Sequence, residues 1–173
     1  DDCEDRAWAQ IGLIAGTVPS LPRKFRSFSH EALAVSWTHA TVLSIADNSP
    51  AAVAGIKTGD QLLTFNNEPI PRHGTAGWIN GYVRNNGERQ IQVLIRRDGI
   101  DEMHTIVPVK ACAIPIELQI DSSINAFTTD DRIVVSSSIL RAARTDAQLA
   151  LVVGHELAHA NLGHLKKRRA NAV

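Results

Sequence analysis

Short apolar segments alternate with turn residues through the middle of the chain, and a longer apolar run lies near its end. The middle pattern predicts several strands and one helix at 75–84. The predicted strands cover residues 33–35, 41–46, 61–65, 68–70, 90–97 and 103–109. The late apolar run, at 149–153, predicts a long helix. We therefore expect a mixed α+β protein.

Turn residues mark the borders of several of these strands. Ser49 and Pro50 suit the N-cap and first position of a short helical turn, and Gly55 can end that turn in a left-handed conformation. Gly59–Asp60 forms a tight turn that opens the next strand, and Asn66–Asn67 is typical of a two-residue hairpin turn. Before all of these, residues 3–15 indicate a short helical segment.

The late helix carries the clearest chemical signal, a His-Glu-x-x-His segment formed by His155, Glu156 and His159. Thr145 and Gln148 have the spacing of a capping box at the start of this helix. Residues four apart lie about 40° apart on one helix face, so the two imidazoles can converge on one Zn²⁺. Glu156 follows the first histidine, where its carboxylate can act as general base on an activated water. The segment predicts hydrolysis of peptide bonds.

An amphipathic helix can also carry two histidines and a glutamate without binding a metal. Burying these side chains without partners is costly, and a metal removes that cost, which favours the zinc site. A catalytic zinc needs a third protein ligand. His164 is near in sequence, but it points away from His159 if the helix continues, and Lys166–Arg169 indicates the basic end of the helix. The third ligand stays unassigned.

Residues 146–159, followed by His164, resemble the active-site helix of the gluzincin metallopeptidases related to HtpX and the CAAX prenyl endopeptidases. The resemblance extends over roughly residues 115–165. Upstream of the helix it rests on the runs 124–127, 133–135 and 138–140, which are similar to two strands and a short helix of that family.

This resemblance implies that His155 and His159 bind Zn²⁺ and that Glu156 is the base. It also implies that the strand around Asn125, Ala126 and Phe127 lines the cleft and pairs with the backbone of a protein or peptide substrate. In the family the third ligand is a glutamate on a later helix, and these 173 residues contain no such segment. We therefore expect this stretch of chain to be inactive by itself.

Residues 49–63 resemble a bacterial-type PDZ domain, a small barrel-like sheet with two helices, and the strands predicted on both sides agree with it. PDZ domains bind extended peptides by strand addition beside a helix. We expect the groove between the strand at 33–35 and the helix at 75–84. The loop at 30–34 lacks a recognisable Gly-rich carboxylate cradle, so peptide capture and a purely structural role both remain open.

These signals predict a PDZ domain at 28–110 inserted into a partial zincin-type metallopeptidase domain. The peptidase part would consist of a helical segment at 1–27 and a core fragment at 111–173. The expected function is that of a zinc-dependent metalloendopeptidase whose PDZ domain recruits substrate or regulates cleavage. The alternative is a PDZ-centred peptide-binding or adaptor protein with an inactive peptidase half.

Composition narrows the partners and the compartment. Basic and acidic residues number 18 each, and no basic face with interleaved aromatics indicates a nucleic-acid partner. No run of 18 or more apolar residues predicts a membrane span. Cys3 and Cys112 flank the expected insertion. They could form a disulfide that joins its two ends, or they could be two buried thiols. A disulfide, and a first residue that is not Met, favour a bacterial periplasm or envelope; a membrane-anchored or cytoplasmic location stays open.

Overall fold

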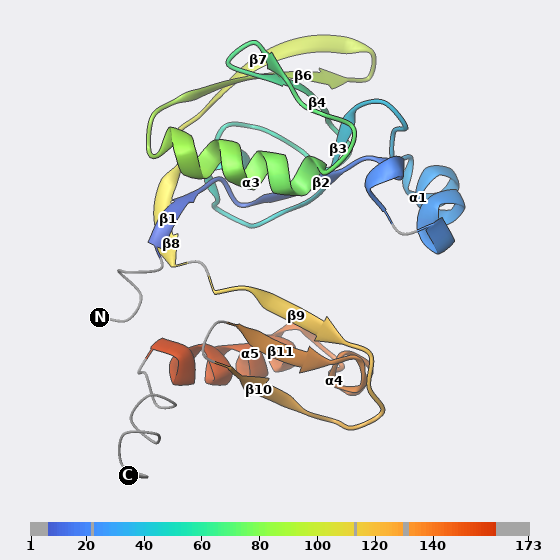
Figure 1. Cartoon of the computed structure of the whole chain (residues 1–173), viewed down its shortest axis with the longest axis vertical. Coiled ribbons are helices and arrows are strands. Elements are labelled where there is room, and N and C mark those ends of the chain that lie inside the picture. Colours follow the sequence, from blue (N-terminus) through green and yellow to red (C-terminus); the bar gives the residue numbers. More distant parts are fainter. Residues whose placement is uncertain (1–6, 22, 113, 130–131, 162–173) are drawn as a thin grey trace. The chain divides into compact units, whose positions relative to one another are not determined.

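The computed structural model describes residues 7–21, 23–112, 114–129 and 132–161. Two compact units are present (Figure 1). Trp8–Ala111 form the first unit, and the described residues from Cys112 onward belong to the second. Both units combine strands with helices, which confirms the predicted α+β class.

The first unit is built on a six-stranded sheet with the order β2-β3-β4-β6-β7, to which β5 adds beside β4. Neighbouring strands are antiparallel throughout. The strands are β2 (Leu13–Gly16), β3 (Ala40–Ile45), β4 (Gln61–Phe65), β5 (Glu68–Pro69), β6 (Ile91–Arg97) and β7 (Ile100–Ile106). A separate two-stranded sheet pairs β1 (Ala7–Gln10) with β8 (Val109–Cys112). The helices are α1 (Arg26–Leu33), α2 (Pro50–Val53) and α3 (Thr75–Asn86).

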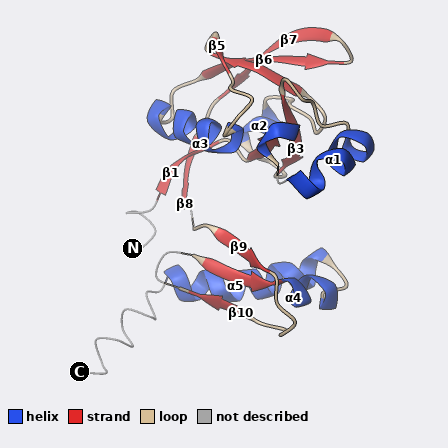
Figure 2. Ribbon diagram, turned by 45° about the vertical axis from the view of Figure 1, so that its right-hand side comes forward, coloured by secondary structure: helices blue, strands red, loops and turns tan. Residues whose placement is uncertain are grey.

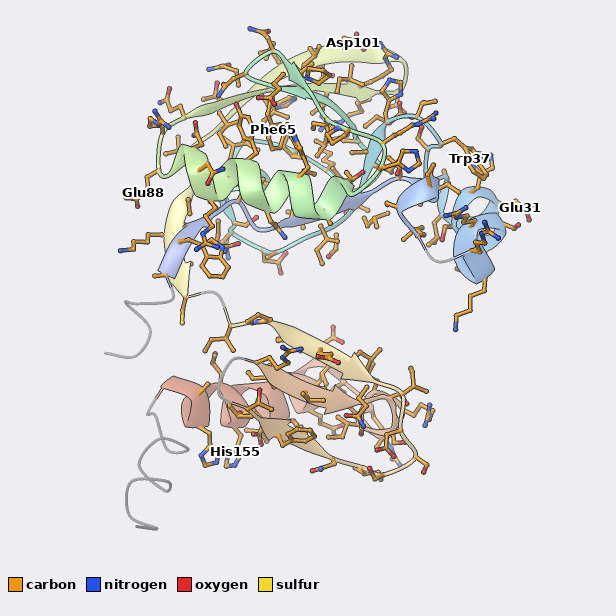
Figure 3. The ribbon with its side chains drawn as sticks, viewed as in Figure 1. Glu31, Trp37, Phe65, Glu88, Asp101 and His155 are labelled. Carbon is orange, nitrogen blue, oxygen red and sulfur yellow. The ribbon has the colours of Figure 1, made fainter. Side chains whose placement is uncertain are left out.

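The core of this unit lies between the large sheet and α3. Phe65 of β4, labelled in Figure 3, is fully buried. Its ring centroid lies 5.9 Å from that of Trp78 and 5.5 Å from that of Tyr82. Successive strand residues point to opposite faces, so alternate positions of β6 enter the core. The fully buried residues of β6 are Ile91, Val93 and Ile95.

The predicted turns form as expected. The Ser49 hydroxyl accepts a hydrogen bond from the Ala52 N–H at 3.3 Å, which caps α2, and Gly55 ends the turn with a φ of +82°. Asn66 and Asn67 have φ values of 47° and 66° between β4 and β5. Two successive left-handed residues are the conformation that a two-residue hairpin with right-twisted strands requires.

The N-terminal region differs from the prediction. The described part of the expected helix at 3–15 forms β1 and β2 instead, joined through Gly12 with a φ of +71°. The reason is long-range pairing, because β1 pairs with β8 and β2 with β3. The structure groups the described residues from Trp8 to Ser27 with the first unit, whereas the prediction assigned residues 1–27 to the peptidase part.

The strand expected at 33–35 was also wrong. Helix α1 runs to Leu33, and Ala34 has a φ of +52° directly after it. Val35 is fully buried, and its N–H donates to the carbonyl oxygen of Ser29 at 3.0 Å. The apolar character at this point thus belongs to the end of a helix and not to a paired strand.

The second unit contains a three-stranded sheet with the order β10-β11-β9. Strand β11 (Ile133–Ser136) is antiparallel to β10 (Ala126–Thr128) and parallel to β9 (Ile116–Gln119). Helix α4 (Ser137–Ala142) follows β11, and α5 (Asp146–Asn161) lies along the sheet, packed on β10 and β11 (Figure 2). None of the helices in the described ranges is long and apolar enough to cross a membrane.

Cys112 is disulfide-bonded. Cys3, the other cysteine of the sequence, lies outside the described residues. Most of the chain that would precede the first unit lies there too, so the insertion of the PDZ domain into the peptidase part stays a prediction.

Candidate active site

The N-terminal cap of α5 and the face that this helix packs into the core determine where the His-Glu-x-x-His segment lies. The Thr145 hydroxyl accepts from the Gln148 N–H at 3.3 Å, while the Gln148 side chain accepts from the Arg144 N–H at 2.7 Å. The predicted cap is therefore present. The Gln148 side chain, however, accepts from the N–H of Arg144 and not from that of Thr145, the cap residue. The apolar stripe of α5 that packs into the core consists of Leu149, Val152 and Val153.

Glu156 continues this stripe, because position 156 follows 149 by seven residues, about two helical turns. Its side chain is half-buried and faces the end of β10. The hydroxyl of Thr128, the last residue of β10, lies 2.9 Å from Oε2 of Glu156 and 2.7 Å from the backbone carbonyl oxygen of Glu156, toward both of which it donates. One hydroxyl thus ties the carboxylate to the adjacent strand.

His155 and His159 project from the same side of α5, one turn apart. The Nε2 atoms are 3.1 Å apart, and the ring centroids are separated by 4.6 Å at an interplanar angle of 86°. His155, labelled in Figure 3, is exposed, and His159 is half-buried. The two Nε2 atoms therefore come close together beside the helix.

This convergence fits a zinc ion. A tetrahedral zinc with Zn–N bonds of about 2.0–2.1 Å brings two ligand nitrogens to about 3.3 Å from each other. The observed Nε2 separation of 3.1 Å is close to that value, so the spacing of these two nitrogens fits two ligands of one zinc ion. Within the described ranges, no third His, Cys, Asp or Glu completes a metal-binding group with them. His164 and the basic stretch 166–169 lie outside the described residues.

The predicted substrate-binding residues lie at an edge of the three-stranded sheet of the second unit. Ala126 and Phe127 belong to β10, and Asn125 precedes it, with its N–H donating to the Ser136 hydroxyl at 3.1 Å. Among the strands that the structure describes, β10 pairs only with β11. Its other edge can accept an added strand, while the Phe127 side chain is 42% exposed. The sequence predicted this strand but not Thr128, because a single Thr carries no motif.

A second candidate site lies in the first unit, in a place that the sequence did not predict. Helix α3 packs beside β2, and not beside a strand at 33–35. A cavity of about 290 Å³ opens there. It is lined by the β1–β2 segment and by residues of β3 and α3, namely Trp8, Ala9, Gln10, Ile11, Gly12, Leu13, Ile14, Ser44, Ala46, Asn80 and Val83.

The turn between β1 and β2 has the features of an anion cradle. Gly12 is left-handed, and a Cβ placed on it would lie 2.3 Å from Cβ of Ser49, so only glycine fits. The carbonyl groups of Ile11 and Gly12 accept from the N–H groups of Ala51 and Ala46, at 2.9 Å each. In the part of the chain that the structure describes, the N–H groups of Ile11 and Gly12 donate to no backbone carbonyl. Such free amides beside a left-handed residue can hold a carboxylate.

Two family models match the chain, and their ranges overlap at residues 89–97. Residues 89–172 match the model of peptidase family M48, and residues 41–97 match the model of the PDZ domain. The "Probable protease eep" of Enterococcus faecalis (strain ATCC 700802 / V583) is 33% identical over 66 residues. That alignment covers 38% of this chain and only 15% of the relative.

Several solved structures share partial similarity with the chain. The HtrA3 PDZ domain bound to a phage-derived ligand (FGRWV) is 21% identical, with a TM-score of 0.47 over 61% of this chain and 89% of that one. The HtrA-type protease AlgW with a decapeptide is 18% identical, with a TM-score of 0.45 over 60% of this chain and 30% of that one. The serine endoprotease from Yersinia pestis is 21% identical, with a TM-score of 0.43 over 61% of this chain and 30% of that one.

The predicted resemblance to peptidases with a PDZ domain is therefore confirmed by the family models. The M48 match begins at residue 89, inside the first structural unit, and continues through the entire His-Glu-x-x-His helix. Residues 41–97 are thus similar to a PDZ domain, and residues 89–172 are similar to part of a family M48 peptidase domain.

Proposed function

We propose that this chain carries half of the active site of a zinc-dependent endopeptidase that acts on protein substrates. The observation that carries the proposal is the convergence of the His155 and His159 Nε2 atoms at 3.1 Å, one residue from a carboxylate held by a neighbouring strand. A bound Zn²⁺ supplies Lewis-acid chemistry, which polarises the scissile carbonyl and activates water. The remaining steps are the work of the protein.

His155 and His159 hold the metal in this proposal, and Glu156 moves the proton. Its carboxylate takes a proton from the attacking water and returns it to the leaving amine as the carbon–nitrogen bond breaks. The open edge of β10 orients the substrate by backbone hydrogen bonds, since an extended peptide can add to a free strand edge. Two histidines leave the metal short of a ligand, and the third would come from a glutamate outside these residues.

The proposal is tested with the complete gene product that contains this chain. We expect Glu156→Gln to retain zinc, because both histidines remain, and to lose casein cleavage by at least about 100-fold, the scale of general-base catalysis. Metal content by elemental analysis and the rate of casein hydrolysis measure the two effects.

Glu117→Gln is the matched control, because Glu117 is an exposed glutamate on β9 that pairs with Arg132 at 2.8 Å. It should cleave at the wild-type rate. Wild-type cleavage by Glu156→Gln would show that Glu156 is not the base. A wild-type protein without zinc and without cleavage would favour the PDZ-centred adaptor instead.

A second function, peptide capture by the PDZ unit, is favoured by the cavity beside Gly12 and its two free backbone amides. We propose that this groove binds the C-terminal residues of a protein and so recruits substrate or regulates cleavage. The added strand would lie between β2 and α3, with its carboxylate at the Ile11–Gly12 amides.

The disulfide-bonded state of Cys112 supports an oxidising compartment. We therefore propose an extracytoplasmic location, such as a bacterial periplasm or envelope.

A further inference from the structure

We propose that Thr128 is a positioning residue that couples the edge strand β10 to the general base Glu156. The inference rests on the proposed role of Glu156 as the base, and it adds a residue outside the His-Glu-x-x-His segment. Its starting point is the Thr128 hydroxyl, which lies 2.9 Å from Oε2 of Glu156.

The sheet register explains why Thr128 meets α5. Ala126 and Thr128 pair with Val135 and Ile133, which are buried in the core beneath α5. Alternation along the strand therefore turns Thr128 toward α5 and Phe127 toward the opposite face. A one-residue slip would exchange these faces and would remove the contact.

The carboxylate of Glu156 has few supports. Among the described side chains, the Thr128 hydroxyl is the one that hydrogen-bonds to it. That hydroxyl also lies 2.7 Å from the Glu156 backbone carbonyl oxygen, so two acceptors of one residue are within reach of its single proton. This arrangement holds the side chain close to the backbone of its own helix turn.

The consequence concerns the distance between substrate and base. A substrate backbone added along β10 and the hydroxyl that holds Glu156 lie on the same short strand. The strand thus fixes the position of the scissile bond relative to the carboxylate. A general base acts over a heavy-atom distance of about 2.6–3.2 Å, and a displacement of about 1 Å can cost about 100-fold in rate.

The test uses Thr128→Val, which removes the hydroxyl with little change in shape, and Thr128→Ser, which keeps it. In the complete gene product, we expect Thr128→Val to lower kcat for casein about 10- to 100-fold, with unchanged KM and zinc content. Thr128→Ser should stay within about threefold of wild type, because it can still donate to the carboxylate. Thr129→Val is the control, since the Thr129 hydroxyl bonds to the Arg132 backbone.

A wild-type kcat for Thr128→Val would overturn the inference, and so would a serine variant as slow as the valine variant. The contact itself is measured without activity, by thermal unfolding of this chain with Thr128→Val, Glu156→Ala and both changes. We expect the double variant to lose less in melting temperature than the two single losses together. Additive losses would overturn the inference while the zinc proposal stands. Absence of cleavage by the wild-type gene product would overturn both.

Discussion

Two adjacent arginines in the first unit show how burial decides the value of an ion pair. Arg97 makes a two-pronged contact with Asp60, both bonds 2.7 Å long, and the Asp60 side chain is 2% exposed. Arg96 pairs in the same manner with Asp101, but these side chains are 41% and 43% exposed. Asp60 also accepts from the Lys57 N–H at 2.7 Å, and Arg97 donates to the Gly55 carbonyl oxygen at 2.9 Å. The buried pair therefore fixes the turn that precedes β4.

We expect Arg97→Met to lower the free energy of unfolding by about 3 kcal/mol, because it leaves the Asp60 carboxylate buried without its cation. Arg96→Met is the matched control and should change the free energy of unfolding far less, since its pair is exposed and screened by water. Urea unfolding of both variants measures the difference. Equal losses would show that the buried pair is no stronger than the exposed one.

The exposed pair has a pH dependence of known sign. Hydrogen bonding from the Arg96 side chain holds the pKa of Asp101 below its ordinary value of 3.8. A carboxylate whose pKa is lower in the folded state stabilises the fold above its unfolded pKa. That small contribution is lost as the pH falls through the folded-state pKa.

At the scale of elements, the PDZ groove depends on which strand lies beside α3. The sequence predicted that α3 begins at Thr75, where the structure has it. The strand beside this helix, β2, lies about sixty residues earlier in the chain. Gly12 forms the left-handed turn at the entrance of that strand. No local pattern distinguishes such a glycine from one that ends a helix. The proposed carboxylate cradle therefore could not be located before the pairing of β1 with β8 and of β2 with β3 was known.

We expect peptides with a free C-terminus, selected from a phage-displayed library, to bind the chain and to lose affinity when their terminus is amidated. Asn80→Trp should abolish this binding, because Asn80 is an exposed residue of α3 that lines the cavity. Asn85→Trp adds the same side chain to α3 outside that cavity and should bind normally. Fluorescence titration measures the affinities. Equal binding by amidated peptides would exclude a carboxylate cradle.

At the scale of the whole molecule, the number of protein ligands limits what the proposed zinc site can do. The described residues present two converging imidazoles and no third protein ligand. A catalytic zinc site normally has three protein ligands. The alignment with the Enterococcus faecalis relative spans only 15% of that protein, so it does not identify a third ligand.

We expect this 173-residue chain to bind zinc weakly and substoichiometrically in equilibrium dialysis, because two imidazoles alone give low affinity. His159→Ala should abolish even this binding, since it removes one of the converging nitrogens. Tight binding of one zinc per chain would reveal a further ligand, for which the residues outside the described ranges, His164 among them, are the candidates.

The sequence by itself determined the features that depend on neighbouring residues. These are the cap at Ser49, the hairpin at Asn66–Asn67 and the placement of His155 and His159 one turn apart, because a helix repeats every 3.6 residues. Only the tertiary structure decided which strand borders α3 and that Thr128 reaches Glu156. Those contacts join segments 28 residues apart or more, and their formation depends on sheet register and burial, which no local pattern encodes.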